Sequence, residues 1–540
     1  MSKSTEKAGL VLAMALAAPA LLGAPAQAAA PYPVVEKSVA QLQADLEAGR
    51  VTSEALVRAY IARIRTIDRA GPRLYSVIAL NPRALADARK SDAARRRHQV
   101  RGPLEGIPVL VKDNIETDDG TATTAGSLAL KDNITLRDAP VARRLKDAGA
   151  IILGKTNLSE WANIRSSRSI SGWSAVGGLV KNPYVLDRGA CGSSAGTGAA
   201  IAASLAAVGV GTETDGSVTC PSSINGLVGL KPTVGLVSRT HIVPISHSQD
   251  TAGPMGRSVE DVALLLTAMA GSDPADPATK DADAHKADYV GALAKADLKG
   301  KRLGVPAVAA GISPEVDAVF AKAVALLKAR GAEVIELKDF KPPADLGAKE
   351  FLVLGTELKA DLNTYLASTP ATVKTRTLAE VIAFNKSHPR ETVLFGQDIF
   401  EQAQQAKGLD DPAYLAARAD SQRAAGPEGI DKLLTDNHLD ALIAPSFGPA
   451  PKIDLPGGER IGGRSSTLPA IAGYPHLTVP MGQVQGLPVG LSFVGPAWSE
   501  ARLLALGYAY EQASHARKPP TYIQSLEATP GAKAAFAPVR

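Results

Sequence analysis

The sequence predicts an α/β fold in which helices alternate with buried strands. Residues 107–111 form an unbroken apolar run with the length of a buried strand, and a helical pattern at 139–148 leads into a second apolar run at 151–154. This alternation is typical of a sheet covered by helices. Apolar residues make up 45% and charged residues 21% of the 540, which allows a sizeable core and excludes wholesale disorder.

The remaining elements follow in chain order. Thr52-Ser53-Glu54 is a capping signal, and the apolar residues after it have helical spacing. Strand 74–80 and helix 82–97 come next. The other predicted elements are helix 195–206, strand 207–211, helix 258–270, strand 302–305, helix 314–330, strand 332–337, a mostly helical stretch at 351–434, strand 439–444 and several strands within 470–495.

The first 28 residues are predicted to be a cleaved signal peptide. Lys3 and Lys7 precede an apolar run at 10–22, and Ala26-Gln27-Ala28 offers a small-residue cleavage site. The run is too short to cross a bilayer comfortably, so stable membrane insertion is not expected, although an uncleaved anchor is an alternative. We expect a mature chain from about Ala29 that is periplasmic or secreted.

The mature chain is expected to hold a single large domain at 34–515 and a C-terminal tail at 516–540. The acidic, proline-containing stretch 273–288 is the linker candidate. We interpret 273–434 as a more variable, mostly helical region that covers the site. The sequence does not determine the oligomeric state, and a monomer is compatible with it.

Charge and cysteine content exclude several classes of function. The formal net charge is +5 with scattered basic residues, and the compact basic run at 95–98 ends a helix, so it is a solvated face and nucleic acid is not an expected partner. The eight histidines and two cysteines show no metal-ligand spacing, so no metal or cofactor is expected. Cys191 and Cys220 could form a disulfide, but two small buried thiols are favoured.

Two serine-bearing glycine loops dominate the centre of the chain. They are Gly192-Ser193-Ser194-Ala195-Gly196 and Asp215-Gly216-Ser217. The helix between them advances about 18 Å and the strand returns about the same distance, so the loops can lie side by side. Glycine lets backbone N–H groups approach a ligand, as in oxyanion holes. Two ordinary turns beside a core helix are the alternative.

A serine nucleophile needs a base. Gly192–Gly196 fits the nucleophile-elbow pattern with Ser194 as nucleophile and His476 as its base, but that interpretation leaves the second serine loop and Lys112 unexplained. Lys112 ends the apolar strand at 107–111. Its pKa would have to fall about three units, about 4 kcal/mol, for it to be neutral near pH 7, and burial can supply such a shift. A snorkelling surface lysine is the alternative.

The motifs together resemble the amidase signature family. They are G-x-P-x-x-x-K-D-N at 106–114, G-S-S-x-G at 192–196 and G-T-x-x-x-G-S at 211–217, followed by G-L-K-P-T at 229–233. The resemblance extends from about residue 34 to 495. It implies a large mixed, twisted sheet surrounded by helices and a Ser–cisSer–Lys triad. Ser217 would be the nucleophile, Ser193 the relay after a cis peptide bond, and Lys112 the base, with oxyanion N–H groups from Thr214, Asp215, Gly216 and Ser217.

Within the family the sequence is similar to bacterial peptide amidases. The similar stretches are KTNLSEWAN at 155–163, SISGW at 169–173, GTETDGS at 211–217 and DTAGPM at 250–255. The resemblance implies an amidase that hydrolyses the C-terminal carboxamide of peptides to the free acid and ammonia. It also suggests substrate contacts from Ser194, Trp161, Trp173 and Asp215. The family commonly has glycine where this chain has Cys191, Ala195 and Asp215.

Other functions use the same motifs. A hydrolase of small aliphatic, aryl or fatty amides would share the triad but have another pocket. The glutaminase subunit of a tRNA-dependent amidotransferase also shares the motifs, but an export signal is incompatible with its cytosolic role. A non-catalytic amide-binding protein is a further alternative, which the presence of Lys112, Ser193 and Ser217 disfavours.

Overall fold

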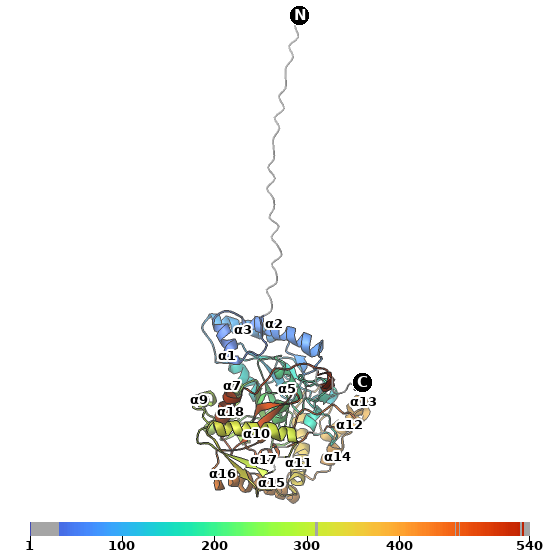
Figure 1. Cartoon of the computed structure of the whole chain (residues 1–540). Helices are drawn as coiled ribbons and strands as arrows, with labels where there is room; N and C mark the ends of the chain where they lie inside the picture. Colours follow the sequence, from blue (N-terminus) through green and yellow to red (C-terminus); the bar gives the residue numbers. More distant parts are fainter. Residues whose placement is uncertain (2–31, 308–310, 460, 464, 530–531, 534–540) are drawn as a thin grey trace, which may run out of the picture.

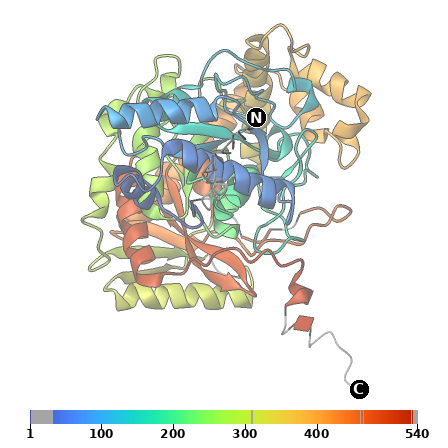
Figure 2. The ribbon, with the colours of Figure 1, turned by 90° about the horizontal axis from the view of Figure 1, so that it is seen from above.

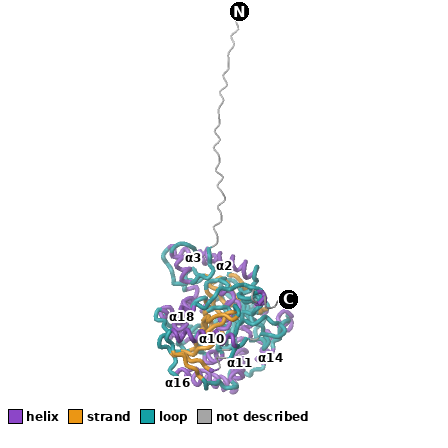
Figure 3. Tube along the Cα trace, in the orientation of Figure 1, coloured by secondary structure: helices purple, strands orange, loops and turns teal. Residues whose placement is uncertain are grey.

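The predicted α/β architecture is confirmed, with one mixed sheet at its centre. The computed structural model describes Met1 and residues 32–307, 311–459, 461–463, 465–529 and 532–533 (Figure 1). These residues form an 11-stranded sheet in the order β1-β3-β2-β6-β8-β7-β12-β13-β11-β9-β10. Figure 3 shows the strands inside the molecule and helices around them. The predicted signal peptide and its cleavage site lie outside the described residues.

The strands of the sheet are short and mostly buried. Their bounds are β1 Val77–Leu80, β2 Pro108–Lys112, β3 Ile151–Thr156, β6 Val208–Glu213, β7 Val228–Lys231, β8 Thr251–Gly256, β9 Arg302–Pro306, β10 Glu333–Leu337, β11 Ala441–Pro445, β12 His476–Val484 and β13 Leu487–Val494. A separate two-stranded sheet pairs β4 Trp173–Ser174 with β5 Gly178–Leu179.

The helices include long amphipathic ones and single turns. The α-helices are α1 Val39–Glu47, α2 Ser53–Arg63, α3 Ala84–Arg96, α4 Pro140–Asp147, α5 Ala195–Ala202, α6 Thr219–Ile224, α7 Val259–Met269, α8 Ala282–His285, α9 Tyr289–Leu293, α10 Pro314–Ala329, α11 Leu346–Ala367, α12 Leu378–Ser387, α13 Pro389–Thr392, α14 Asp398–Gln404, α15 Pro412–Ala425, α16 Lys432–Asp436, α17 Thr467–Ala472 and α18 Glu500–Ser514. Short 3₁₀ turns lie at Leu128–Leu130, Glu160–Asn163, Pro277–Thr279 and Leu526–Ala528, and π-helical turns at Ile64–Arg69 and Gly426–Asp431.

The sheet register places the carboxyl ends of three strands together. β2 pairs in parallel with both β3 and β6, and all three are buried along their length. Helices α5 and α6 contact each other and the central strands. Helix α7 contacts both α4 and α18, and α18 also contacts α10. The long yellow-green helix α10 lies along the lower edge of the protein body in Figure 2. Burial on both faces explains why β2 is a nearly continuous apolar run in the sequence.

Two sequence predictions about segment boundaries are wrong. The stretch 273–288 is no linker, because Asp276 forms a 2.5 Å ion pair with Arg239 and Asp273 accepts hydrogen bonds from the hydroxyls of Ser238 and Thr240 at 2.6 Å. The helix predicted at 195–206 ends at Ala202, and Ser204 has a left-handed φ of 54°. A helix does not continue through that conformation.

Part of the region 273–434, which was predicted to cover the site, belongs to the main sheet instead. Residues 302–337 supply β9 and β10, which form a parallel edge of the main sheet, with α10 between them in the chain. The mainly helical part that follows, α11 to α16, lies at the bottom and right of Figure 1. At the other end, the predicted tail begins on the protein body, since Tyr522 donates its N–H to the carbonyl of Pro183. Among the described residues, no helix is both long and apolar enough to cross a membrane.

Candidate active site

Lys112 lies at the carboxyl end of β2 and is fully buried. Its Nζ lies 2.7 Å from Ser193 Oγ and 2.8 Å from Thr212 Oγ1. Burial lowers the pKa of Lys112 to about 7, against the opposing charges of Asp250 and Glu213. The amine can therefore be neutral near pH 7 and accept a proton from the Ser193 hydroxyl across the same contact. The alternative of a snorkelling surface lysine is wrong.

The peptide bond between Gly192 and Ser193 is cis, as the resemblance implies. Ser193 is fully buried just before the first turn of α5. Gly192 allows the loop to pack closely, because an added Cβ would lie 2.2 Å from Ser159 Oγ. The backbone of this loop also binds Ser159, whose N–H donates to the carbonyl of Ser193.

Ser217 ends the turn between β6 and α6. The N–H of Ser194 donates to the carbonyl of Ser217 at 3.1 Å, so the two serine loops meet as the sequence predicted. Gly216 has a φ of 80°, which favours glycine at this turn. Ser217 is 7% exposed, and its hydroxyl makes no hydrogen bond to another described residue. The hydroxyl therefore remains available to a substrate at the meeting point of the loops.

Glu213 holds this turn and was missed in the sequence. Its Oε2 accepts the N–H groups of Val218 at 2.7 Å and Thr219 at 2.8 Å, so it caps the start of α6 directly behind Ser217. Burial raises the pKa of Glu213, against these hydrogen bonds and the charge of buried Lys231. Glu213 ends β6, six residues before α6 begins, so no local capping pattern in the sequence indicates that it holds the turn of Ser217.

The elbow interpretation with Ser194 and His476 is wrong. Ser194 is fully buried, and its hydroxyl donates to the carbonyl of Thr212 and accepts the Thr212 N–H, at 3.1 and 3.2 Å. His476 lies on β12 with Nε2 2.6 Å from Ser492 Oγ, and burial lowers its pKa to about 3. With both hydrogen bonds of its hydroxyl committed to Thr212, Ser194 holds the strand end rather than lining a pocket.

The other residues suggested for substrate contact lie in different surroundings. Trp161 is 3% exposed and packs edge-on against Phe400, while Trp173 packs edge-on against Phe395. Asp215 reaches a cavity of about 210 Å³ beside Gly192 and Gly216. Of these three residues, Asp215 lines the cavity that also includes Gly192 and Gly216, whereas both tryptophans are buried against aromatic neighbours. Their roles in substrate contact stay predictions.

Two cavities flank the Thr212–Ser217 turn. The 210 Å³ cavity is lined by Asn163, Ser171, Cys191, Gly192, Asp215, Gly216, Cys220, Phe447, Glu459, Ile461, Gly463 and Ser466. A second cavity of about 440 Å³ includes Asn114, Thr212, Thr214, Arg239, His241, His247, Asp250, Asp361 and Tyr365. The turn predicted to form the oxyanion hole thus separates a space beside Gly216 from one beside Thr214.

Cys191 and Cys220 form a disulfide, which corrects the favoured interpretation as two free thiols. The bond joins the residue before Gly192 to the first turn of α6, and it borders the smaller cavity. The positions of the two cysteines beside the two serine loops made a disulfide possible, but two cysteines form no framework pattern that would favour the pairing. Only the approach of the two loops brings their Cα atoms to 6.0 Å.

We expect the disulfide to stabilise the fold by about 3–4 kcal/mol, because it closes a loop with a sequence separation of 29 residues. In urea titrations, the double variant Cys191→Ala/Cys220→Ala should have a free energy of unfolding lower than that of wild type by this amount. Wild type reduced with dithiothreitol should show the same decrease. An unchanged denaturation midpoint in both cases would contradict the prediction.

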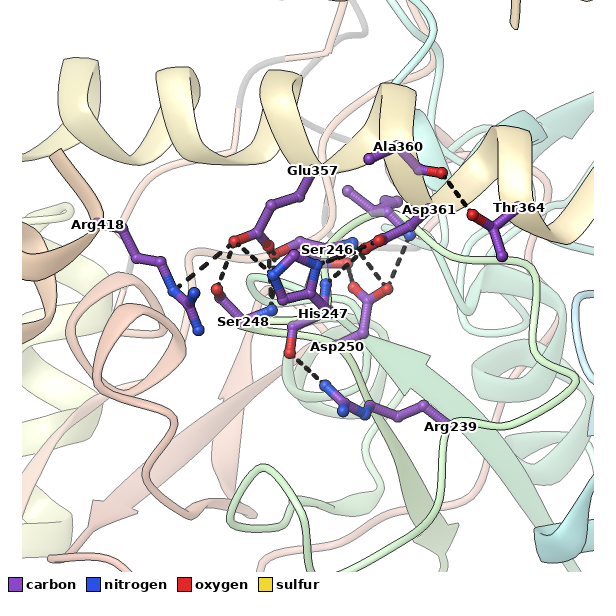
Figure 4. Close-up of polar contacts among 12 residues, drawn as sticks. Arg239, Ser246, His247, Ser248, Asp250, Glu357, Ala360, Asp361, Thr364 and Arg418 are labelled. Carbon is purple, nitrogen blue, oxygen red and sulfur yellow. Dashed lines mark hydrogen bonds and ion pairs between the residues drawn. The ribbon is translucent and has the colours of Figure 1, made fainter. Parts of the chain in front are cut away.

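His247, Glu357 and Asp361 are the described residues that gather metal-ligand atoms, all within 4.8 Å (Figure 4). The two imidazole nitrogens face different carboxylates, however, and Glu357 accepts hydrogen bonds from Ser248 and Tyr414. These contacts describe a hydrogen-bonded ion-pair cluster. That no metal is needed stays a prediction.

Comparison with known proteins settles the family. Residues 55–504 match the family model described as Amidase. The chain belongs to the amidase signature family. A probable amidase of Arabidopsis thaliana is 38% identical over 505 residues, which cover 91% of this chain and 93% of the relative.

Solved structures of the family agree closely with this fold. The native peptide amidase of Stenotrophomonas maltophilia is 49% identical, covers 91% of this chain and 100% of its own, and has a TM-score of 0.85. A structure of the peptide amidase PAM with the competitive inhibitor chymostatin is 50% identical over the same 91% of this chain and 100% of its own, with a TM-score of 0.86. This amidase is therefore an amidohydrolase that acts on C–N bonds.

Proposed function

We propose that this amidase hydrolyses the C-terminal carboxamide of peptides through Ser217, Ser193 and Lys112. The observation that carries the triad is the 2.7 Å contact between Ser193 Oγ and the Nζ of a fully buried lysine. Burial favours the neutral amine, which is the form that a base requires. The similarity to peptide amidases over nine-tenths of the chain supports the peptide substrate.

We propose the following mechanism for this triad. Ser217 Oγ bonds to the carboxamide carbon while its proton passes to Ser193, whose own proton passes to Lys112. The N–H groups of 214–217 stabilise the oxyanion, since they need no reorganisation as charge develops. The C–N bond then breaks as the relay returns a proton to nitrogen, which releases ammonia. Water attacks the acyl-enzyme by the same proton route and yields the acid and free Ser217.

The smaller cavity is the proposed peptide site. It adjoins Gly192 and Gly216 and has polar groups from Asn163, Ser171 and Asp215. Such groups suit the amide backbone of a peptide better than a long acyl chain. A hydrolase of simple aliphatic or aryl amides is the second candidate, because the same triad serves any carboxamide.

The test is incubation of the purified protein with one C-terminally amidated peptide, followed by mass analysis and an ammonia assay. We expect the full-length peptide acid and one equivalent of ammonia. Internal fragments would make the enzyme a peptidase. Turnover of simple amides without turnover of the peptide would contradict the peptide assignment and retain the amidase.

The rate should depend on pH through Lys112. With a pKa of about 7, Lys112 is increasingly protonated as the pH falls, and the protonated amine cannot accept the relay proton. We therefore expect kcat/KM to fall about tenfold per pH unit below pH 7. Initial rates from pH 5 to 8 measure this limb. A flat profile over that range would contradict Lys112 as the base.

We further propose that the protein is exported and acts in the periplasm or outside the cell. The charged, apolar and small-residue segments at 1–28 support export, and the Cys191–Cys220 disulfide suits an oxidising compartment. Sequencing of the N-terminus after expression with the full leader tests this. A mature chain starting near Ala29 is expected.

A further inference from the structure

The turn at 245–250 connects the proposed oxyanion hole to helix α11. Asp250 Oδ1 accepts the hydroxyl of Thr214 at 2.6 Å, and its Oδ2 accepts the N–H groups of Ile245 and Ser246 at 2.7 and 2.9 Å. The side-chain amide of Gln249 donates a hydrogen bond from Nε2 to the carbonyl oxygen of Thr214 at 3.4 Å. The turn thus holds Thr214 by both its side chain and its backbone.

His247 fastens the same turn to α11. Nδ1 lies 2.9 Å from Asp361 Oδ2, and Nε2 lies 3.2 Å from Glu357 Oε1 (Figure 4). The backbone N–H of His247 also donates to Asp361 at 3.0 Å. Glu357 and Asp361 are one helical turn apart on α11, so one imidazole spans both carboxylates.

An imidazole with a carboxylate at each nitrogen can donate to both only when it is protonated. The hydrogen bond to Asp361 raises the pKa of His247, with support from the charge of Glu357 and against partial burial. Glu357 is fully buried and also accepts hydrogen bonds from Ser248 and the hydroxyl of Tyr414.

The other charged neighbours of His247 complete its surroundings. From α15, Arg418 lies 3.8 Å from Glu357 Oε1 and opposes protonation of the histidine. From the preceding segment, Arg239 donates to the carbonyl of His247 and pairs with Asp276. Asp250, three residues on, has a pKa raised by burial to about 6. When His247 is protonated, its charge balances the carboxylate pair of α11.

We propose that His247 is a positioning residue: as an imidazolium between Glu357 and Asp361, it holds the 245–250 turn so that Asp250 keeps Thr214 in place for the oxyanion. The inference rests on the proposed triad but not on a peptide substrate, because every carboxamide passes through the same oxyanion. His247 lines the 440 Å³ cavity with Thr214, so the coupling acts on that side of the site.

The pH dependence then has two limbs of opposite origin. Lys112 must lose its proton, so the rate rises through about pH 7. His247 must keep its proton, so the rate falls again as the pH passes its raised pKa. Protonation of Asp250 lies on the acidic side, below about pH 6, and does not produce the alkaline limb.

The experiment compares kcat and KM from pH 6 to 10 in wild type, His247→Gln, His247→Lys and the control His285→Gln. His285 is exposed, and its ring stacks on Trp498 rather than on a residue of the His247 cluster. The substrate is any carboxamide that wild type hydrolyses. We expect His247→Gln to lower kcat about tenfold with little change in KM and to lose the alkaline limb, since misplacing one oxyanion donor costs up to about 10²–10³-fold.

His247→Lys keeps a cation at this position to higher pH than histidine does. It should therefore restore kcat to within about threefold of the wild-type value and shift the alkaline limb to higher pH. This rescue separates positioning from a folding defect, because a merely damaged fold would not regain a shifted limb. The control should match wild type in both constants.

Several results would overturn the inference. One is a His247→Gln enzyme with wild-type kcat and an unchanged alkaline limb; another is a His247→Lys enzyme no better than His247→Gln. Inactivation of wild type by EDTA with recovery on added Zn²⁺ would assign the cluster to a metal ion instead. Failure of wild type to hydrolyse any carboxamide would overturn the proposed function itself.

Discussion

Ser217→Ala is expected to lower kcat for carboxamide hydrolysis by about 10⁴-fold or more, because no other group can form the acyl-enzyme. The substitution removes one hydroxyl that makes no hydrogen bond to another described residue, so the fold and KM should change little. Ammonia release under saturating substrate measures the effect. Incubation of wild type with a slow substrate should also give an acyl adduct by mass that the variant lacks.

The neighbouring serine provides the matched control. Ser194 is as buried as Ser193, but its hydroxyl binds Thr212 rather than Lys112. Ser194→Ala should keep kcat within about tenfold and lose about 1 kcal/mol of stability from its broken hydrogen bonds. If Ser194→Ala abolished the reaction and Ser217→Ala did not, the nucleophile would be assigned to the wrong loop.

Lys112→Met should lower kcat by about 10³-fold or more and at the same time stabilise the protein. The activity falls because the relay loses its base, and proton transfer by a positioned base is worth about 10²–10⁴-fold. The side chain is similar in length, so β2 should keep its place. Activity at pH 8, where wild-type Lys112 is mostly neutral, gives the comparison.

The stability gain follows from the sign of the pKa shift. Lys112 has a pKa of about 7 in the folded protein and about 10.4 when unfolded, so the unfolded state binds more protons between these values. Folding is therefore penalised by about 4 kcal/mol at pH 7 and about 1 kcal/mol at pH 9.5. The gain in Lys112→Met should shrink accordingly between urea titrations at these two pH values.

Lys155 is the control for this variant, since it is equally buried on neighbouring β3 but contacts Thr123 and the carbonyl of Ile115. Lys155→Met should leave much more activity than Lys112→Met. Equal losses in both variants would mean that Lys112 acts through packing and not as a base.

Local sequence predicted the strand that ends in Lys112 and the glycine loops that carry Ser193 and Ser217. These features are determined by short-range rules: an apolar run of strand length must be buried, and glycine permits the tight turns. The spacing of helix and strand also predicted that the loops return to one place. The motif pattern then added the expectation of a cis peptide bond at Ser193.

Contacts between distant segments decided the rest. The pairing of Cys191 with Cys220, the orientation of Ser194 toward Thr212 and the docking of 273–288 on Arg239 all depend on where separate elements meet. So does the cluster of His247 with Glu357 and Asp361, in which the partners are more than a hundred residues apart. The sequence by itself determined the residues of the proposed triad and their local backbone, because periodicity and turn chemistry act within a few residues. Only the tertiary structure decided which buried groups are partners, because burial and charge pairing depend on neighbours that the chain order does not reveal.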